Sequence, residues 1–137
     1  MPSLILPYPI SANRYWRIFQ GRAVQSADAT AYKGHIWALA RSKGISDPII
    51  APVSLELILR PLRPLDGDRR ERLQGRDWHL KLRCLDLDNA LKVALDALQG
   101  IAYADDKQVR RIKIERGMPV NGGALEVSWT TEDAKHE

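Results

Sequence analysis

The chain has 137 residues, of which 45% are hydrophobic and 28% charged, with a formal net charge of +4. This composition is typical of one globular domain and argues against a disordered chain; no apolar run approaches the roughly 18 residues that a membrane span needs. One cysteine excludes an internal disulfide and favours a reducing cytoplasm. The three histidines have no zinc-site spacing, so metal chemistry here would use oxygen ligands.

Hydrophobic periodicity predicts a single α+β domain over residues 1–137 in the order β-α-β-loop-α-β-β, a mixed sheet with helices packed on one face. Residues 61–83 are rich in proline, glycine and charge, which is typical of a long loop. The tail, residues 131–137, is expected to be disordered. The expected elements, in chain order, are a strand at 3–6, a loop at 11–21, a helix at 26–43, a strand at 53–60, the loop at 61–83, a helix at 88–99 with a buried stripe that includes Leu91 and Leu95, a strand at 107–116, a turn at 118–123 and a last strand around 125–129.

The positive charge is concentrated in one stretch. Residues 60–83 contain eight basic and four acidic side chains, which accounts for the whole excess of +4. Such charge is often only a solvated face, but basic stretches on both sides of an acidic cluster favour a phosphate partner, and hence nucleic acid. Residues 13–16 are either a packed loop or a DNA contact. The candidate DNA-binding residues are Arg14, Tyr15, Arg69, Arg70, Arg72, Arg76, Lys81 and Arg83.

An acidic motif, DLDN, begins at Asp86 and leads directly into the second expected helix. In an extended backbone, residues i and i+2 point to the same side about 6.6–6.8 Å apart, so Asp86 and Asp88 can converge on a hard cation such as Mg²⁺. Lys92 lies one helical turn after Asp88 and faces the same way. Asp88 is also a good helix N-cap, and that alternative stays open. A calcium-binding EF-hand is excluded, because glycine and glutamate are missing at its sixth and twelfth positions.

A second acidic pair, Asp105 and Asp106, lies in the short loop after this helix. Aspartates in such a loop are commonly turn formers without any function. Taken together with Asp86 and Asp88, however, they would complete a carboxylate cluster around Mg²⁺. For Asp106 to meet Asp86, the strand at 107–116 would have to run back beside the start of the helix. No P-loop, GxGxxG or GxSxG motif is present, so we expect no organic cofactor.

The order and spacing of these motifs resemble the RusA family of Holliday junction resolvases. The resemblance covers nearly the whole chain outside residues 61–83. The family carries arginines immediately before its first acidic residue, whereas this chain has only Lys81 and Arg83 there. The matching runs are LPYP from Leu6, SANRYWR from Ser11, DLDN from Asp86, Lys92, DAL from Asp96 and DDKQV from Asp105.

The resemblance implies a Mg²⁺-dependent, homodimeric endonuclease that resolves four-way DNA junctions by paired symmetric nicks, in recombination and repair. It assigns the catalytic carboxylates, and with them the metal ligands, to Asp86, Asp88 and Asp106. It assigns the essential lysine to Lys92, and Asp105 would be an auxiliary ligand.

Two other functions remain open on the sequence. A non-catalytic, structure-selective DNA-binding protein would share the basic surface, with the acidic cluster serving a structural role. A metal-dependent enzyme acting on small phosphoesters would use residues 61–83 as a lid. Affinity for DNA separates the small-molecule enzyme from the other two functions, and Mg²⁺-dependent cleavage separates the nuclease from the binding protein.

Overall fold

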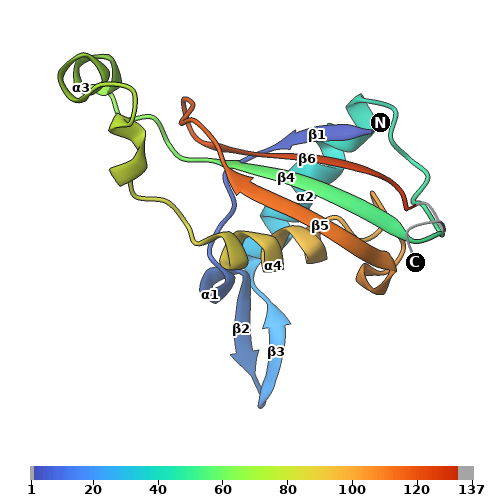
Figure 1. Cartoon of the computed structure of the whole chain (residues 1–137). Helices are drawn as coiled ribbons and strands as arrows, with labels where there is room; N and C mark the ends of the chain where they lie inside the picture. Colours follow the sequence, from blue (N-terminus) through green and yellow to red (C-terminus); the bar gives the residue numbers. More distant parts are fainter. Residues whose placement is uncertain (1, 133–137) are drawn as a thin grey trace.

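The structure is a computed structural model that describes residues 2–132. Its main body is a four-stranded sheet with two helices on one face, from which a two-stranded hairpin and a small helical lobe project (Figure 1). The elements are β1 (Ser3–Leu6), α1 (Ala12–Tyr15), β2 (Trp16–Phe19), β3 (Arg22–Gln25), α2 (Ala27–Ser42), β4 (Val53–Arg60), α3 (Gly67–Gln74), the 3-10 turn η1 (Trp78–Lys81), α4 (Leu87–Ala97), the 3-10 turn η2 (Asp106–Gln108), β5 (Val109–Arg116) and β6 (Ala124–Thr131).

The main sheet has the strand order β1-β6-β4-β5. Strand β4 pairs antiparallel with β6 and parallel with β5, and β1 pairs antiparallel with β6, so the predicted mixed sheet is confirmed. The crossover between β4 and β5 contains α4, which lies along the sheet face beneath β5 (Figure 1). Strand β5 is consequently an edge strand of the sheet.

The core lies between the sheet and helices α2 and α4. Alternate residues of β4 are buried, as a half-covered strand requires, and they meet the inward side chains of β1 and β6. Helix α2 begins at the N-cap Ser26, whose hydroxyl accepts the amide of Ala29 at 3.1 Å. Helix α4 buries its small residues, which lets it approach the sheet closely. The buried residues of α2 and α4 are Ala29, Tyr32, Ile36, Ala40, Ala90, Val93, Ala94 and Ala97.

Two segments predicted as loops contain regular structure. Residues 11–21 form α1 and the first strand of the β2–β3 hairpin. Residues 61–83 contain α3 and η1, so the expectation of an irregular loop was wrong there. The predicted disorder of 131–137 is also corrected at its start, because β6 continues to Thr131 and the Glu132 amide donates to the Pro52 carbonyl at 2.7 Å. The rest of that tail lies outside the described residues.

The helical lobe formed by residues 61–83 is built around Trp78. This side chain is only 3% exposed, and the Arg63 guanidinium lies 5.0 Å from its ring centroid. Arg63 also pairs with Asp68 at 2.5 Å and with Glu71 at 3.7 Å, which ties α3 to the chain entering the lobe. The lobe is therefore held together by contacts of Trp78 and Arg63 within it. Between residues 2 and 132, no helix is long and apolar enough to cross a membrane.

Candidate active site

The first acidic pair lies where the chain enters α4. The chain before the helix is fixed by Tyr8, whose hydroxyl accepts the Leu85 amide at 2.8 Å, and by Arg116, which donates to the Leu85 carbonyl at 3.3 Å. The first turn is fixed by Asn89, whose side-chain oxygen accepts the Ala12 amide at 2.6 Å. Contacts from the segment after β1, from α1 and from β5 therefore hold the backbone that carries Asp86 and Asp88.

Neither carboxylate of this pair is used in capping the helix. Asp86 occupies the N-cap position but makes no side-chain cap hydrogen bond, and Asp88 lies in the first turn. Both side chains are exposed, as is Lys92 one turn further on. Within residues 2–132, the structure gives none of the three an ion pair. The capping role that the sequence left open for Asp88 is therefore absent, and the three charged groups face solvent together at the start of α4.

The second acidic pair is held by two glutamines that the sequence analysis did not identify. Gln108 accepts the amides of Ala104 and Asp105 at 2.9 and 2.8 Å, while its amide nitrogen donates to two carbonyls of the 49–51 segment. Gln99 accepts the Asp106 amide at 3.2 Å. The two side chains fix the short loop between α4 and β5, because between them they accept the amides of three consecutive residues, 104–106. Their hydrogen-bonding roles depend on tertiary contacts that local sequence does not reveal.

The two aspartates of this loop have different electrostatic environments. Asp105 accepts the Lys107 amide at 2.9 Å, and this hydrogen bond lowers the pKa of its carboxyl group. The pKa of Asp106 is raised, first by partial burial and then by the neighbouring carboxylates of Asp105 and Asp96. A cation bound beside Asp106 would relieve this repulsion, as expected for a metal ligand.

The structure does not bring the two acidic pairs together within one chain. Asp86 precedes α4 and Asp106 follows it; the eleven residues of this helix correspond to about 16.5 Å. Strand β5 does run back beside the start of α4, but it is Arg116, at its far end, that arrives there. Among residues 2–132, no three acidic, histidine or cysteine side chains could hold a metal ion. The predicted cluster of Asp86, Asp88 and Asp106 is therefore not formed by a single chain.

Asp96, near the C-terminal end of α4, accepts hydrogen bonds from several elements. Its carboxylate accepts the Tyr15 hydroxyl, the Gln25 amide at 2.6 Å and the Gln99 amide at 3.3 Å. Lys33 of α2 lies 3.7 Å away. Asp96 thus connects the base of the β2–β3 hairpin to α4 and, through Gln99, to the Asp105–Asp106 loop.

The predicted DNA-binding residues fall into three groups. Tyr15 is fully buried, and burial together with its hydrogen bond to Asp96 raises the pKa of its hydroxyl, so its predicted DNA contact is corrected to a packing role. Arg14 is exposed but pairs with Asp28 at 3.0 Å, and Arg70 pairs with Asp66 at 3.0 Å. The remaining residues are exposed on the lobe and on the chain that leaves it. Within residues 2–132 none of them forms an ion pair. They are Arg69, Arg72, Arg76, Lys81 and Arg83.

Comparisons with known proteins agree on one family. The model of the family described as Endodeoxyribonuclease RusA matches residues 7–128. The crossover junction endodeoxyribonucleases RusA of Escherichia coli (strain K12) and Shigella sonnei (strain Ss046) are each 30% identical over 129 residues, covering 93% of this chain and 92% of the relative. The enzyme of that name from Enterobacteria phage 82 is 29% identical over 128 residues, with the same coverage. The chain belongs to the RusA family of endodeoxyribonucleases.

Proposed function

We propose that this protein is a Mg²⁺-dependent endonuclease that resolves four-way DNA junctions by paired symmetric nicks, in recombination and repair, and that it works as a homodimer. The family and the names of its relatives support junction cleavage. The observation that carries the proposal is the position of the two acidic pairs, one at each end of the α4–β5 layer, with an open apolar surface between them.

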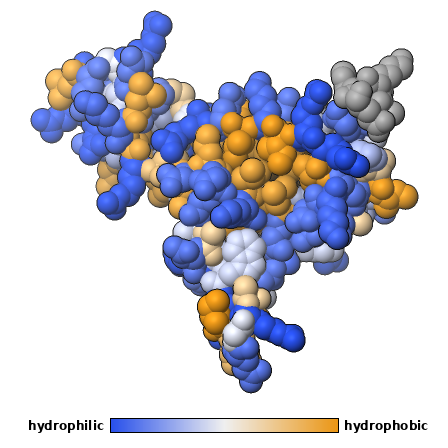
Figure 2. All heavy atoms as spheres, turned by 60° about the horizontal axis from the view of Figure 1, so that its bottom comes forward, coloured by the Kyte–Doolittle hydropathy of each residue, from blue (hydrophilic) through white to orange (hydrophobic). Residues whose placement is uncertain are grey.

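This surface, the seam, is formed by Leu87, Leu91, Leu95, Ile112 and Ile114. The three leucines follow each other at intervals of four along α4, and the two isoleucines lie on the inward face of β5. Leu91 and Leu95 are only half-buried, although the periodicity predicted them in the core, and Ile112 is 39% exposed. Figure 2 displays a broad apolar area on the face that carries α4 and β5. An apolar face along an unpaired edge strand is typical of a surface that a partner covers.

A second copy of the chain is the partner that fits the seam. A two-fold axis through its middle sets α4 antiparallel to its copy, since each end of the seam then meets the opposite end of the other protomer. Asp105 and Asp106 of each protomer thereby approach Asp86 and Asp88 of the other. Two equivalent sites result, each combining both acidic pairs, and a four-way junction needs two cuts.

The donor set of such a combined site fits Mg²⁺, which prefers carboxylate oxygens. Asp86, Asp88 and Asp106 would hold the ion, with Asp105 beside them as an auxiliary ligand. The bound ion would polarise the scissile phosphate and lower the pKa of a water molecule. Lys92 projects from the same end of α4 and would stabilise the negative charge that develops on the phosphate oxygens.

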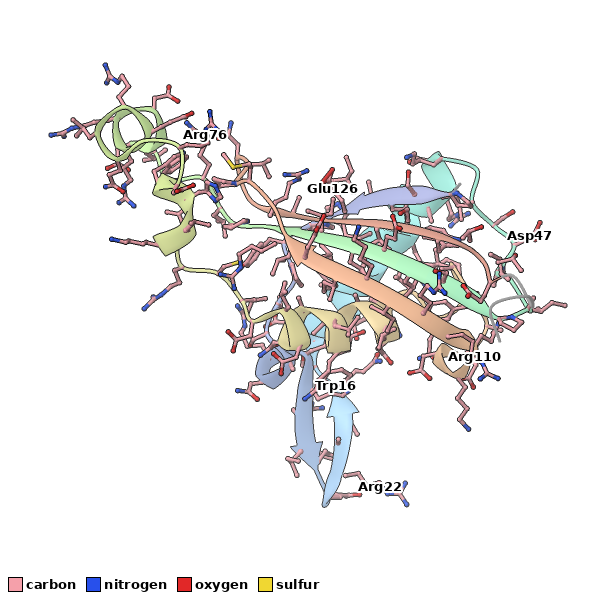
Figure 3. All side chains as sticks on the ribbon, viewed as in Figure 1. Trp16, Arg22, Asp47, Arg76, Arg110 and Glu126 are labelled. Carbon is pink, nitrogen blue, oxygen red and sulfur yellow. The ribbon has the colours of Figure 1, made fainter. Side chains whose placement is uncertain are left out.

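The lobe would supply contacts to the DNA backbone. Its exposed arginines carry no sequence information by themselves, but they neutralise phosphates and so increase affinity. Figure 3 labels Arg76 on this lobe, and Arg110 at the opposite end of β5. Arg116 reaches the Leu85 carbonyl beside the first acidic pair, and Arg110 follows the second pair at the start of β5, so cations near each pair would offset the repulsion between carboxylates and DNA.

The proposal is tested with a labelled four-way junction and a linear duplex of matching sequence, each with and without Mg²⁺. We expect cuts at symmetric positions on opposite strands of the junction, only with Mg²⁺, and an uncut duplex. Junction binding without cleavage would favour a non-catalytic DNA-binding protein. Hydrolysis of a small phosphodiester without affinity for the junction would reject a DNA substrate.

A further inference from the structure

The β2–β3 hairpin projects from the body (Figure 1), and two large apolar side chains near its tip are exposed. Ile18 is 78% exposed and Phe19 is 52% exposed, and both lie in a sheet of only two strands, β2 and β3. Exposing such side chains to water is unfavourable, and a partner that covered them would remove that cost. Their position at the end of a projecting element makes them accessible to a partner of the body.

The tip is tight and well defined. Phe19 pairs with Arg22, and the two residues between them, Gln20 and Gly21, have φ angles of 52° and 76°. Two consecutive positive φ angles are typical of the type I′ turn, whose twist matches that of the strands it joins. The apolar side chains are therefore presented on a short ribbon rather than on an irregular loop.

The base of the hairpin is fixed to the α4 layer. Gln25 donates to Asp96 at 2.6 Å, the Ser26 amide donates to the Tyr15 carbonyl at 2.9 Å, and the ring of Trp16 packs on that of Tyr15 with centroids 4.4 Å apart. Figure 3 places Trp16 beside α4 and Arg22 at the far end of the ribbon. Since Asp96 is also linked through Gln99 to the Asp106 loop, the base of the hairpin is connected to the second acidic pair.

The charge around the tip matches nucleic acid. Residues 16–25 contain two arginines and no acidic residue. The Arg17 guanidinium lies 5.5 Å from the centroid of the Phe19 ring, and Arg22 is the cross-strand neighbour of Phe19. An apolar wedge flanked by cations is the arrangement with which proteins unstack base steps while binding the adjacent phosphates. A purely hydrophobic protein partner would not require these two cations.

We infer that the β2–β3 hairpin is a wedge that inserts Phe19, with Ile18 beside it, into the base stack of DNA at the branch point of a junction, while Arg17 and Arg22 bind the flanking phosphates. The inference rests on the proposed function and deepens it. Base pairs at a branch point have lost stacking continuity on one side, so they are the easiest to separate. The hairpin would hold the arms of the junction apart while the carboxylates act.

The test uses the full-length protein in EDTA and a four-way junction with 2-aminopurine at the branch point, whose fluorescence rises when the base is unstacked. Wild type should increase the fluorescence severalfold at saturation. The double variant Ile18→Ser/Phe19→Ala should bind with affinity within about fivefold of wild type and lose most of the increase. Ile5→Ser, at an isoleucine 64% exposed on the outward side of β1, is the matched control and should behave as wild type. Because all these side chains are exposed, the thermal midpoint of unfolding should not change.

An unaltered fluorescence increase in the double variant overturns the wedge, as does a defect confined to self-association, which would make the tip a contact between protomers. Mg²⁺-dependent cleavage is measured separately on the same junction. Cleavage by wild type without a fluorescence change rejects the wedge and keeps the proposed function. A fluorescence increase that requires Phe19, without cleavage, supports the wedge and rejects the catalysis. Failure of wild type to bind the junction overturns both.

Discussion

At the scale of single residues, the charged groups at the start of α4 are available for chemistry because they take no part in stabilising the helix. Asp86→Asn, Asp88→Asn and Asp106→Asn should each reduce junction cleavage by at least about 100-fold, since an amide keeps the shape but loses the charge that a hard cation requires. Junction binding should be unchanged or tighter, because a negative charge near phosphate is removed. Single-turnover cleavage and gel-shift assays measure the two effects separately. A variant with full activity would remove that residue from the metal site.

Gln108 illustrates a residue that acts through the backbone it holds. Gln108→Ala removes hydrogen bonds to four backbone groups around the Asp105–Asp106 loop, and its expected cost is about 1–3 kcal/mol of unfolding free energy. Cleavage should fall more than junction affinity does, because the position of Asp106 is loosened. Urea unfolding and cleavage rates check the two effects. Gln74→Ala, at an exposed glutamine at the end of α3, is the control; an equal loss of activity there would contradict the role of Gln108.

At the scale of elements, the lobe of residues 61–83 is a folded carrier of positive charge. Replacing Arg69, Arg72 and Arg76 with glutamine should weaken junction binding and reduce the slope of log affinity against log salt by about 2 to 3, since each phosphate contact contributes about 0.9. Stability should not change, because all three side chains are exposed. Lysine at the same positions should restore most of the slope. An unchanged slope in the glutamine variant would show that the lobe does not contact DNA.

The elements differ in how far sequence could predict them. Strands β4 and β6 and helices α2 and α4 each cover one side of a core, so their periodicity is strong and their positions were predicted closely. The β2–β3 hairpin was missed because much of both strands is exposed on both faces, which leaves no alternation to detect. Helix α3 was missed because, apart from Gly67, its residues are not buried. The distance between the acidic pairs depends on the register between α4 and β5, which local pattern does not determine.

In the whole molecule, leucines of α4 that were predicted in the core lie half-exposed in the seam, where a second protomer would cover them. A charge in the middle of the seam should prevent two protomers from meeting. Ile112→Lys should therefore shift sedimentation from dimer to monomer and abolish junction cleavage, while the fold survives because Ile112 is already 39% exposed. Ile5→Lys introduces the same charge on the outward side of β1 and should remain dimeric and active. A wild-type protein that sediments as a monomer at working concentration and leaves single nicks would refute the dimer.

In the proposed dimer, each active site combines acidic pairs from different protomers, and a mixture of two inactive variants can show whether the sites are shared. In a mixed dimer of Asp86→Asn and Asp106→Asn, one site carries both substitutions and the other carries neither. The mixture should therefore regain cleavage, as single nicks in a cruciform plasmid, although each variant alone is inactive. A mixture of Asp86→Asn and Asp88→Asn, which damages both sites, should remain inactive. If the first mixture is also inactive while mixed dimers are present by mass spectrometry, the active sites are not shared between protomers.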